Sequence, residues 1–189
     1  MTQSIAADPN LYLIYEMKAW VLILQKRPEE AIIAAERGLA LNPSYVGAYF
    51  PMCVATGALG HPERSVELAD KAIRLSPRDP LLPAFYWQKA YHYFMAQQDV
   101  QAIEWMRRML AVDNKWPIPK LYLAALLALN GKETEARETV KNYLSLKDIE
   151  IRSIRALETW LYLWSDTPHW TAYVNRLSEG LRKAGMPEE

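Results

Sequence analysis

RPEEAIIAAERGLALNP (residues 27–43) and HPERSVELADKAIRLSP (residues 61–77) are two copies of one pattern, 34 residues apart. In each copy a proline followed by glutamate marks the first turn of a helix, because proline's missing N–H costs nothing there and the acidic side chain suits the positive end of the helix dipole. An Asn-Pro or Ser-Pro pair closes each copy, since the residue before proline is pushed out of the helical region. The two stretches therefore predict one helix that recurs in the chain.

Each of these helices is the second half of a larger unit, made of two helices joined by a short turn. A preceding apolar segment with helical spacing, residues 10–25 or 44–59, supplies the first helix. Two weaker copies of the unit follow, so that the period is 34, 37 and then 34 residues. A period in this range is typical of helical repeat arrays. The predicted repeats are residues 10–43, 44–80, 81–116 and 117–148.

The four units resemble the tetratricopeptide repeat (TPR) family over roughly residues 10–148. Eight positions that are small in that family are small here, and small side chains let antiparallel helices approach closely. These positions are Ala19, Cys53, Ala90 and Ala124 in the first helices, and Ala31, Ser65, Ala102 and Ala136 in the second helices. The resemblance implies an all-α, right-handed superhelix of four helix pairs.

Three residues depart from the family pattern. Met109 and Tyr143 stand where a later small residue is expected, so we expect the third and fourth repeats to pack more loosely or to be rotated. Pro51 lies inside a helical run, where it would clash with the carbonyl of Gly47. We expect that helix to kink or to start late.

The two ends of the chain are predicted to differ from the repeats. Carried backwards, the register makes residues 1–9 the tail of a preceding repeat, so we expect the chain to be a piece of a longer protein. Residues 149–189 leave the register, because small positions would fall on Glu158 and Trp170. We expect two helices there that cap the last repeat.

Composition and charge argue against several classes of function. The 22 basic and 22 acidic residues give a net charge of 0, so no overall field attracts nucleic acid or an anionic membrane. Cys53 is the single cysteine, and His61, His92 and His169 lack metal-ligand spacing. No phosphate-binding loop or catalytic motif is visible. We therefore predict a non-catalytic protein without metal or cofactor and, with no signal peptide and no membrane span, a cytoplasmic one.

The densest basic group interleaves cations with tryptophan between residues 105 and 120. Such a mixture is also found in nucleic-acid sites. Because the net charge is 0 and the spacing is helical, we interpret it as a solvated face with core tryptophans, Trp105 and Trp116 among them.

The candidate site is the inner face of the first helices, where the resemblance places ligand-facing side chains. Its candidate groove residues are Glu16, Trp20, Phe50, Val54, Trp87, Tyr91, Phe94, Met95 and Leu121. The Lys, Arg and Asn residues with which family members clamp a peptide carboxylate are missing. A large apolar surface usually marks a contact. The predicted occupant is an apolar peptide or helix of a protein partner, a second copy of the chain or a missing segment of the parent protein; alternatively, tight curvature closes the groove into ordinary core.

Two further segments are similar to the C-terminal TPR regions of bacterial class III adenylate or guanylate cyclases and winged-helix regulators. They are LSPRDPLLPAFYW (residues 75–87) and RLSEGLRKAGMPEE (residues 176–189). This resemblance implies a sensory or regulatory region in signal transduction, and no catalytic residue can be carried over. The main prediction remains a protein-interaction scaffold. The alternatives are that regulatory region, a homodimer formed through the groove, and an enzyme built on helices.

Overall fold

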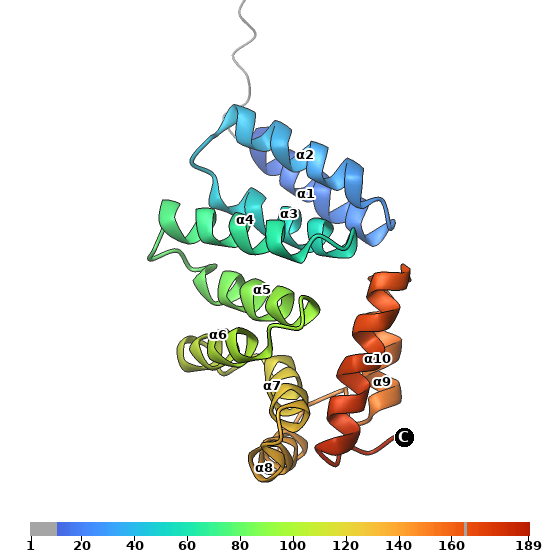
Figure 1. Ribbon diagram of the computed structural model, residues 1–189. Helices are drawn as coiled ribbons and strands as arrows, with labels where there is room; N and C mark the ends of the chain where they lie inside the picture. The colour runs from blue at the N-terminus through green and yellow to red at the C-terminus, as the bar shows by residue number, and fades with distance from the viewer. Residues whose placement is uncertain (1–10, 165) are drawn as a thin grey trace, which may run out of the picture.

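A computed structural model describes residues 11–164 and 166–189, and this part of the chain is entirely helical, without strands (Figure 1). The predicted all-α class is confirmed. The first four helices are α1 (Leu11–Leu24), α2 (Pro28–Leu41), α3 (Tyr49–Ala58) and α4 (Pro62–Leu75). The next four are α5 (Leu82–Met95), α6 (Asp99–Val112), α7 (Ile118–Leu129) and α8 (Glu133–Leu144), and the last two are α9 (Ile154–Leu161) and α10 (Pro168–Lys183).

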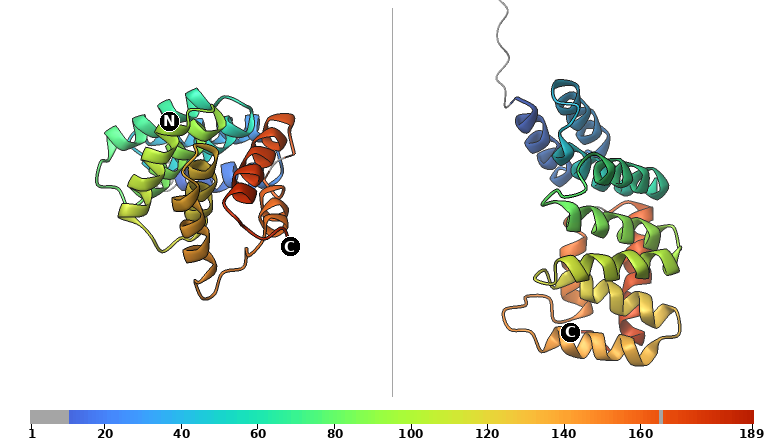
Figure 2. Two further views of the ribbon diagram at one scale, coloured as in Figure 1. Left: turned by 60° about the horizontal axis from the view of Figure 1, so that its bottom comes forward. Right: turned by 90° about the vertical axis from the view of Figure 1, so that its left-hand side faces the viewer.

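Helices α1 to α8 form four antiparallel pairs that stack one on the next (Figures 1 and 2). All eight predicted small residues are buried, and none is more than 1% exposed. Cys53 and Ser65 show how close two helices come: the Ser65 hydroxyl donates to the Cys53 carbonyl at 2.9 Å, and the Cys53 thiol donates to the Ser65 carbonyl at 3.4 Å. The close-approach rule therefore holds in every pair. The predicted tail of a preceding repeat, residues 1–9, lies outside the described residues.

Proline sets the start of several helices. Pro28 and Pro62 each occupy the first position of their helix, as predicted. Around Pro51 the chain first makes a 3₁₀ turn, Val46–Ala48, and the α-helix begins only at Tyr49. Pro51 then lies in the first turn, where its missing N–H leaves no hydrogen bond unmade. The expected late start of this helix is confirmed.

The larger residues of the third and fourth repeats are accommodated without loose packing. Met109 and Tyr143 are each about 1% exposed, and the Tyr143 hydroxyl donates to the Ile151 carbonyl at 2.8 Å. The expectation of looser packing is therefore wrong at these two residues. The alternative expectation, rotation, fits Figure 1, where α7 and α8 are turned relative to α5 and α6.

The C-terminal helices do more than cap the last repeat. Helix α10 packs against α7 and continues past α5 toward the N-terminal repeats, with α9 beside it (Figures 1 and 2). The Thr167 hydroxyl at its start reaches the Ala58 carbonyl at the end of α3, at 3.4 Å. The C-terminal pair thus contacts the last repeat through α7, and α10 in addition runs along the array. The physical reason is its apolar stripe, which finds aromatic partners on the inner face.

Candidate binding cavity on the inner face

An aromatic cavity of about 260 Å³ lies between the N-terminal repeats and the α9–α10 pair. We call it the aromatic cavity, and its lining residues are Trp20, Phe50, Val54, Trp87, Gln88, Tyr91, Trp116, Tyr122, Trp160, Leu161, Trp164 and Trp170. Six of the seven tryptophans in the chain are in this set. Side chains from α1, α3, α5, α7, α9 and α10 meet there, so the cavity exists only in the assembled array.

Three ring pairs of the aromatic cavity meet edge to face. The ring centroids of Trp87 and Trp116 are 4.7 Å apart, and those of Trp87 and Tyr122 are 4.5 Å apart, with interplanar angles of 64° and 73°. Trp20 and Phe50 meet at 5.1 Å and 76°. This arrangement is the favoured one for aromatic pairs, because it sets the positive edge of one ring against the negative face of the next. The walls are therefore held by contacts between the rings themselves.

The lining carries little polarity and no charged side chain. Gln88 is bound through Oε1 to His92 Nε2 at 3.1 Å, and burial lowers the pKa of His92 to about 3, so its ring is neutral near pH 7. The Tyr122 and Tyr173 hydroxyls bind one another. Burial raises the pKa values of Tyr91 and Tyr122. These groups are therefore uncharged at neutral pH.

Glu16 stands behind the aromatic cavity. Its carboxylate accepts hydrogen bonds from Trp20 Nε1, at 3.4 Å, and from the Tyr45 hydroxyl. Burial and the contact with Glu16 raise the pKa of Tyr45. Glu16 therefore orients Trp20 and places a negative charge next to its indole.

The predicted groove residues fall into three groups. Trp20, Phe50, Val54, Trp87 and Tyr91 line the aromatic cavity. Phe94 and Met95 line a second cavity of about 200 Å³ between α5 and α10. Leu121 is fully buried, and Glu16 contacts the aromatic cavity only through Trp20.

Part of the inner face is covered by the chain's own helix α10. The ring of Tyr173 lies 5.0 Å from that of Tyr91 and 5.7 Å from that of Phe94. At Gly180 the backbone of α10 comes so close to Ala125 that an added Cβ would lie 2.7 Å from the Ala125 carbonyl oxygen. Helix α10 therefore occupies the inner face next to α5 and α7.

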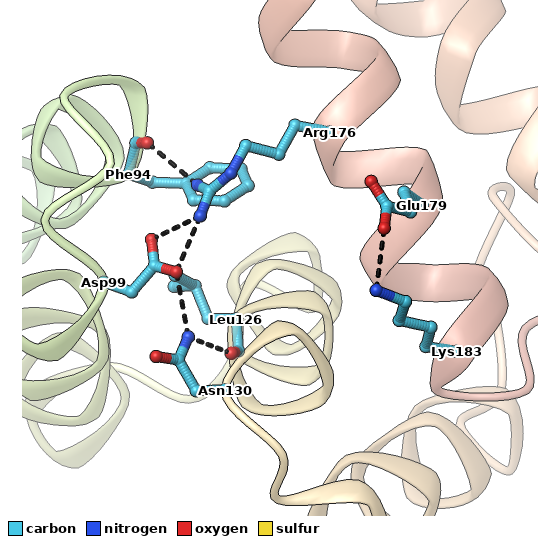
Figure 3. Close-up of polar contacts among 7 residues, drawn as sticks. All are labelled: Phe94, Asp99, Leu126, Asn130, Arg176, Glu179 and Lys183. Carbon is cyan, nitrogen blue, oxygen red and sulfur yellow. Dashed lines mark hydrogen bonds and ion pairs between the residues drawn. The ribbon is translucent and has the colours of Figure 1, made fainter.

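An ion pair fixes α10 in this position (Figure 3). Arg176 donates to both carboxylate oxygens of Asp99, at 2.8 and 2.6 Å, and to the Phe94 carbonyl at 3.1 Å. Its guanidinium also lies 4.5 Å from the centre of the Phe94 ring. Asn130 donates to the same carboxylate at 2.9 Å and to the Leu126 carbonyl at 2.8 Å. Arg176 thus joins α10 to α5 and α6, and Asn130 links the same carboxylate to the end of α7.

Sequence reasoning missed half of the cavity wall. Gln88, Trp116, Tyr122, Trp160, Leu161, Trp164 and Trp170 were not among the candidates. Trp116 was interpreted as a core tryptophan, but it is 36% exposed and lines the aromatic cavity. The available signal was the gathering of tryptophans at residues 160, 164 and 170, which lie on α9, just after it, and on α10.

Residues 11–164 and 166–189 give little support to a reactive thiol, a metal site or a membrane-spanning helix. Burial raises the pKa of the Cys53 thiol to about 12, which keeps it protonated at neutral pH. Among these residues no group of histidine, cysteine, aspartate and glutamate side chains could hold a metal ion. None of the described helices combines the length and the apolarity that crossing a membrane requires.

Comparisons with known proteins find likeness only at the level of structure. No family model matches the chain, and no curated protein matches it. The crystal structure of PilW, a widely conserved type IV pilus biogenesis factor, matches with a TM-score of 0.70 and 20% identity over 92% of this chain and 76% of that one. A putative kinesin light chain of Podosopora anserina, with nearly identical TPR-like repeats, matches with a TM-score of 0.66 and 17% identity over 95% and 89%.

A third likeness is to YrrB, described as a TPR protein with an unusual peptide-binding site. Its TM-score is 0.59, with 15% identity over 90% of this chain and 82% of that one. These structures give no support to the resemblance to cyclases or winged-helix regulators. At such identities the likeness concerns architecture, and the hand of the superhelix remains a prediction. The chain has a TPR-like helical repeat fold.

Proposed function

We propose that this chain is a non-catalytic protein-interaction scaffold that binds an apolar peptide or helix of a partner at its inner face, with the partner's anchoring group in the aromatic cavity. The observation that carries the proposal is the gathering of six tryptophans around one open, uncharged cavity. Buried aromatic side chains dominate the energetics of protein interfaces. The TPR-like fold supports the same reading, since YrrB, a protein of this fold, is described as having a peptide-binding site.

Helix α10 shows what kind of surface the inner face accepts. It meets Tyr91 with Trp170 and Tyr173, at centroid distances of 6.3 and 5.0 Å, while Arg176 pairs with Asp99 at the edge. An amphipathic helix with aromatic anchors and a basic rim therefore fits this part of the groove. A partner that binds while α10 is in place reaches the aromatic cavity, where no part of α10 beyond Trp170 lines the wall.

Peptide display on the immobilised chain, followed by calorimetry of the selected peptides, tests the proposal. We expect peptides rich in apolar residues, and Trp116→Ala should weaken them by about tenfold or more, the usual effect of removing an interface anchor. Tyr162→Ala is the matched control, because Tyr162 and Trp116 are both 36% exposed but only Trp116 lines the cavity. Equal affinities for the two variants, or no selected peptide, would contradict the proposal.

Sedimentation at several protein concentrations tests a second copy as the occupant. A mass that rises with concentration in the wild type but not in Trp116→Ala would assign the cavity to homodimerisation. A constant monomer mass removes this use of the groove.

A further inference from the structure

We propose that the group entering the aromatic cavity is a fully methylated ammonium, such as the trimethylammonium head of a methylated lysine or of a choline-like molecule. The proposal rests on the proposed function, because it names the chemistry of the anchor at the same site. The lining residues include no carboxylate that could pair with an ammonium group. A primary ammonium would lose its water inside a cavity without a carboxylate, and its three N–H groups would find only the few neutral polar atoms of Gln88, Tyr91 and Tyr122. A trimethylammonium group has no N–H to satisfy.

The faces of the cavity rings are free of protein cations. The tryptophan outside the cavity, Trp105, has two: the Lys89 ammonium nitrogen lies 3.6 Å from its centroid and the Arg108 guanidinium lies 4.6 Å from it. In residues 11–164 and 166–189, none of the cation–ring contacts involves a ring of the aromatic cavity. Indole faces attract cations more strongly than other rings do. A cation is therefore the complement that this cavity lacks.

Charge near the cavity points the same way. The Glu16 carboxylate accepts the hydrogen bond of Trp20 Nε1 and so sets a negative charge behind one wall. A neutral hydrocarbon gains nothing from that charge, whereas a cation enclosed by the rings is stabilised by it. The cavity volume of about 260 Å³ suits a head group rather than a whole drug-sized molecule.

The test compares two ligands of the same shape, choline and 3,3-dimethylbutan-1-ol, in which carbon replaces the charged nitrogen. Tryptophan emission and calorimetry of the full chain report binding, since six of the seven tryptophans line the site. We expect choline to bind at least about fivefold more tightly than the alcohol, the factor that corresponds to a cation–π gain of about 1 kcal/mol. The inference would be overturned if the alcohol bound as tightly as choline or more tightly. It would also be overturned if neither choline nor the trimethyllysine peptide described below bound. An alcohol that binds as well as choline would leave the proposed apolar site standing.

Two further arms sharpen the result. Glu16→Gln should weaken choline severalfold without changing the affinity for the alcohol, while Glu63→Gln, at an exposed site outside the cavity, should change neither. An equal loss of affinity for both ligands in Glu16→Gln would overturn the role of charge.

A peptide carrying trimethyllysine is compared with the same peptide carrying unmodified lysine. Preference for the methylated peptide over choline assigns the head group to a protein side chain, and the reverse order assigns it to a free molecule; either order supports the inference.

Discussion

His92 has no exposed surface, and an added Cβ on Gly57 would lie 2.0 Å from its ring. Burial lowers the pKa of His92 from its ordinary 6.5 to about 3, so the folded state keeps the ring neutral while the unfolded chain protonates it. The stability that this contributes is present above pH 6.5 and is lost as the pH falls toward 3. Between pH 7.5 and 5 we expect the free energy of unfolding in urea to fall by about 2 kcal/mol through this residue.

The control for this loss is a second histidine. His92→Gln should remove most of the pH dependence between 7.5 and 5, and His169→Gln, at an exposed position, should retain it. The carboxylates whose pKa values are lowered, such as Glu30 and Asp166, act at more acidic pH and do not confuse the comparison. An unchanged slope in His92→Gln would contradict the assignment.

The close contact at Gly180 predicts the sign of the stability change in Gly180→Ala. In an exposed helix, glycine to alanine stabilises by about 1 kcal/mol. At Gly180 the new Cβ would meet the Ala125 carbonyl oxygen at 2.7 Å and the Ala125 Cβ at 2.8 Å, so α10 must shift away from α7. We expect Gly180→Ala to destabilise by about 1–3 kcal/mol in urea unfolding. A gain in stability would show that the two helices are not in close contact.

Single residues were predictable from sequence where the repeat dictates them. The eight small positions follow from the spacing and are buried, and Pro51 correctly predicts the late start of its helix. Gly180 was not predictable in this way, because its neighbour Ala125 lies 55 residues earlier and outside any repeat relation to it. Close approach can be foreseen only where a period repeats it.

At the scale of the element, Arg176 and Lys183 on α10 offer a matched pair (Figure 3). Arg176 is 25% exposed and joins three helices, while Lys183 is 51% exposed and pairs with Glu179 on its own helix. Removing one partner of a partly buried ion pair leaves the charge of the other without its compensating opposite charge. We expect Arg176→Ala to lower the free energy of unfolding by about 1–3 kcal/mol and Lys183→Ala by less than about 0.5 kcal/mol.

Hydrogen exchange locates the effect of that change. Relative to the wild type, hydrogen exchange in Arg176→Ala should accelerate more at the amides of α10 than at those of α2, which has no contact with the ion pair. Equal losses of stability in the two variants, or uniform acceleration across the chain, would argue against Arg176 as the residue that holds α10.

The existence of α10 was predicted as the second of two helices in residues 149–189, and the helix runs from Pro168 to Lys183. Its position was not. An amphipathic stripe shows that one face is buried but does not show against what. Both the end of the fourth repeat and the inner face offered an apolar surface, and the decisive contacts, Arg176 with Asp99 and Tyr173 with Tyr91, are 77 and 82 residues apart in sequence.

At the scale of the whole molecule, the aromatic cavity depends on the α9–α10 pair. A chain ending at residue 148 lacks Trp160, Trp164 and Trp170, and exposes the rings that α10 covers. We expect its remaining tryptophan emission to shift to longer wavelength and a hydrophobic dye to bind, while circular dichroism retains most of the helix. Unshifted emission with no dye binding would mean that the inner face closes without α10.

The repeat architecture could be predicted from the sequence because it depends on neighbours 34 to 37 residues apart. The cavity could be predicted only in part, since four of its twelve lining residues come from outside the repeat register. Trp20, Phe50 and Trp87 follow from inner-face positions, whereas Trp160, Trp164 and Trp170 join them through tertiary contact.

Lys26 pairs with Asp166 across 140 residues, and Thr167 meets Ala58 across 109. In an open solenoid each unit touches only its neighbours, so stability grows unit by unit and the ends fray first. Here the last helix returns to the first repeats and closes the array on itself. Helix α10 and the residue before it span from Ala58 at the end of α3, met by Thr167, to Ala125 in α7, met by Gly180. Insertion or deletion of a whole unit between α3 and α7 would change that span, so we expect this helix to limit how many units can lie between them.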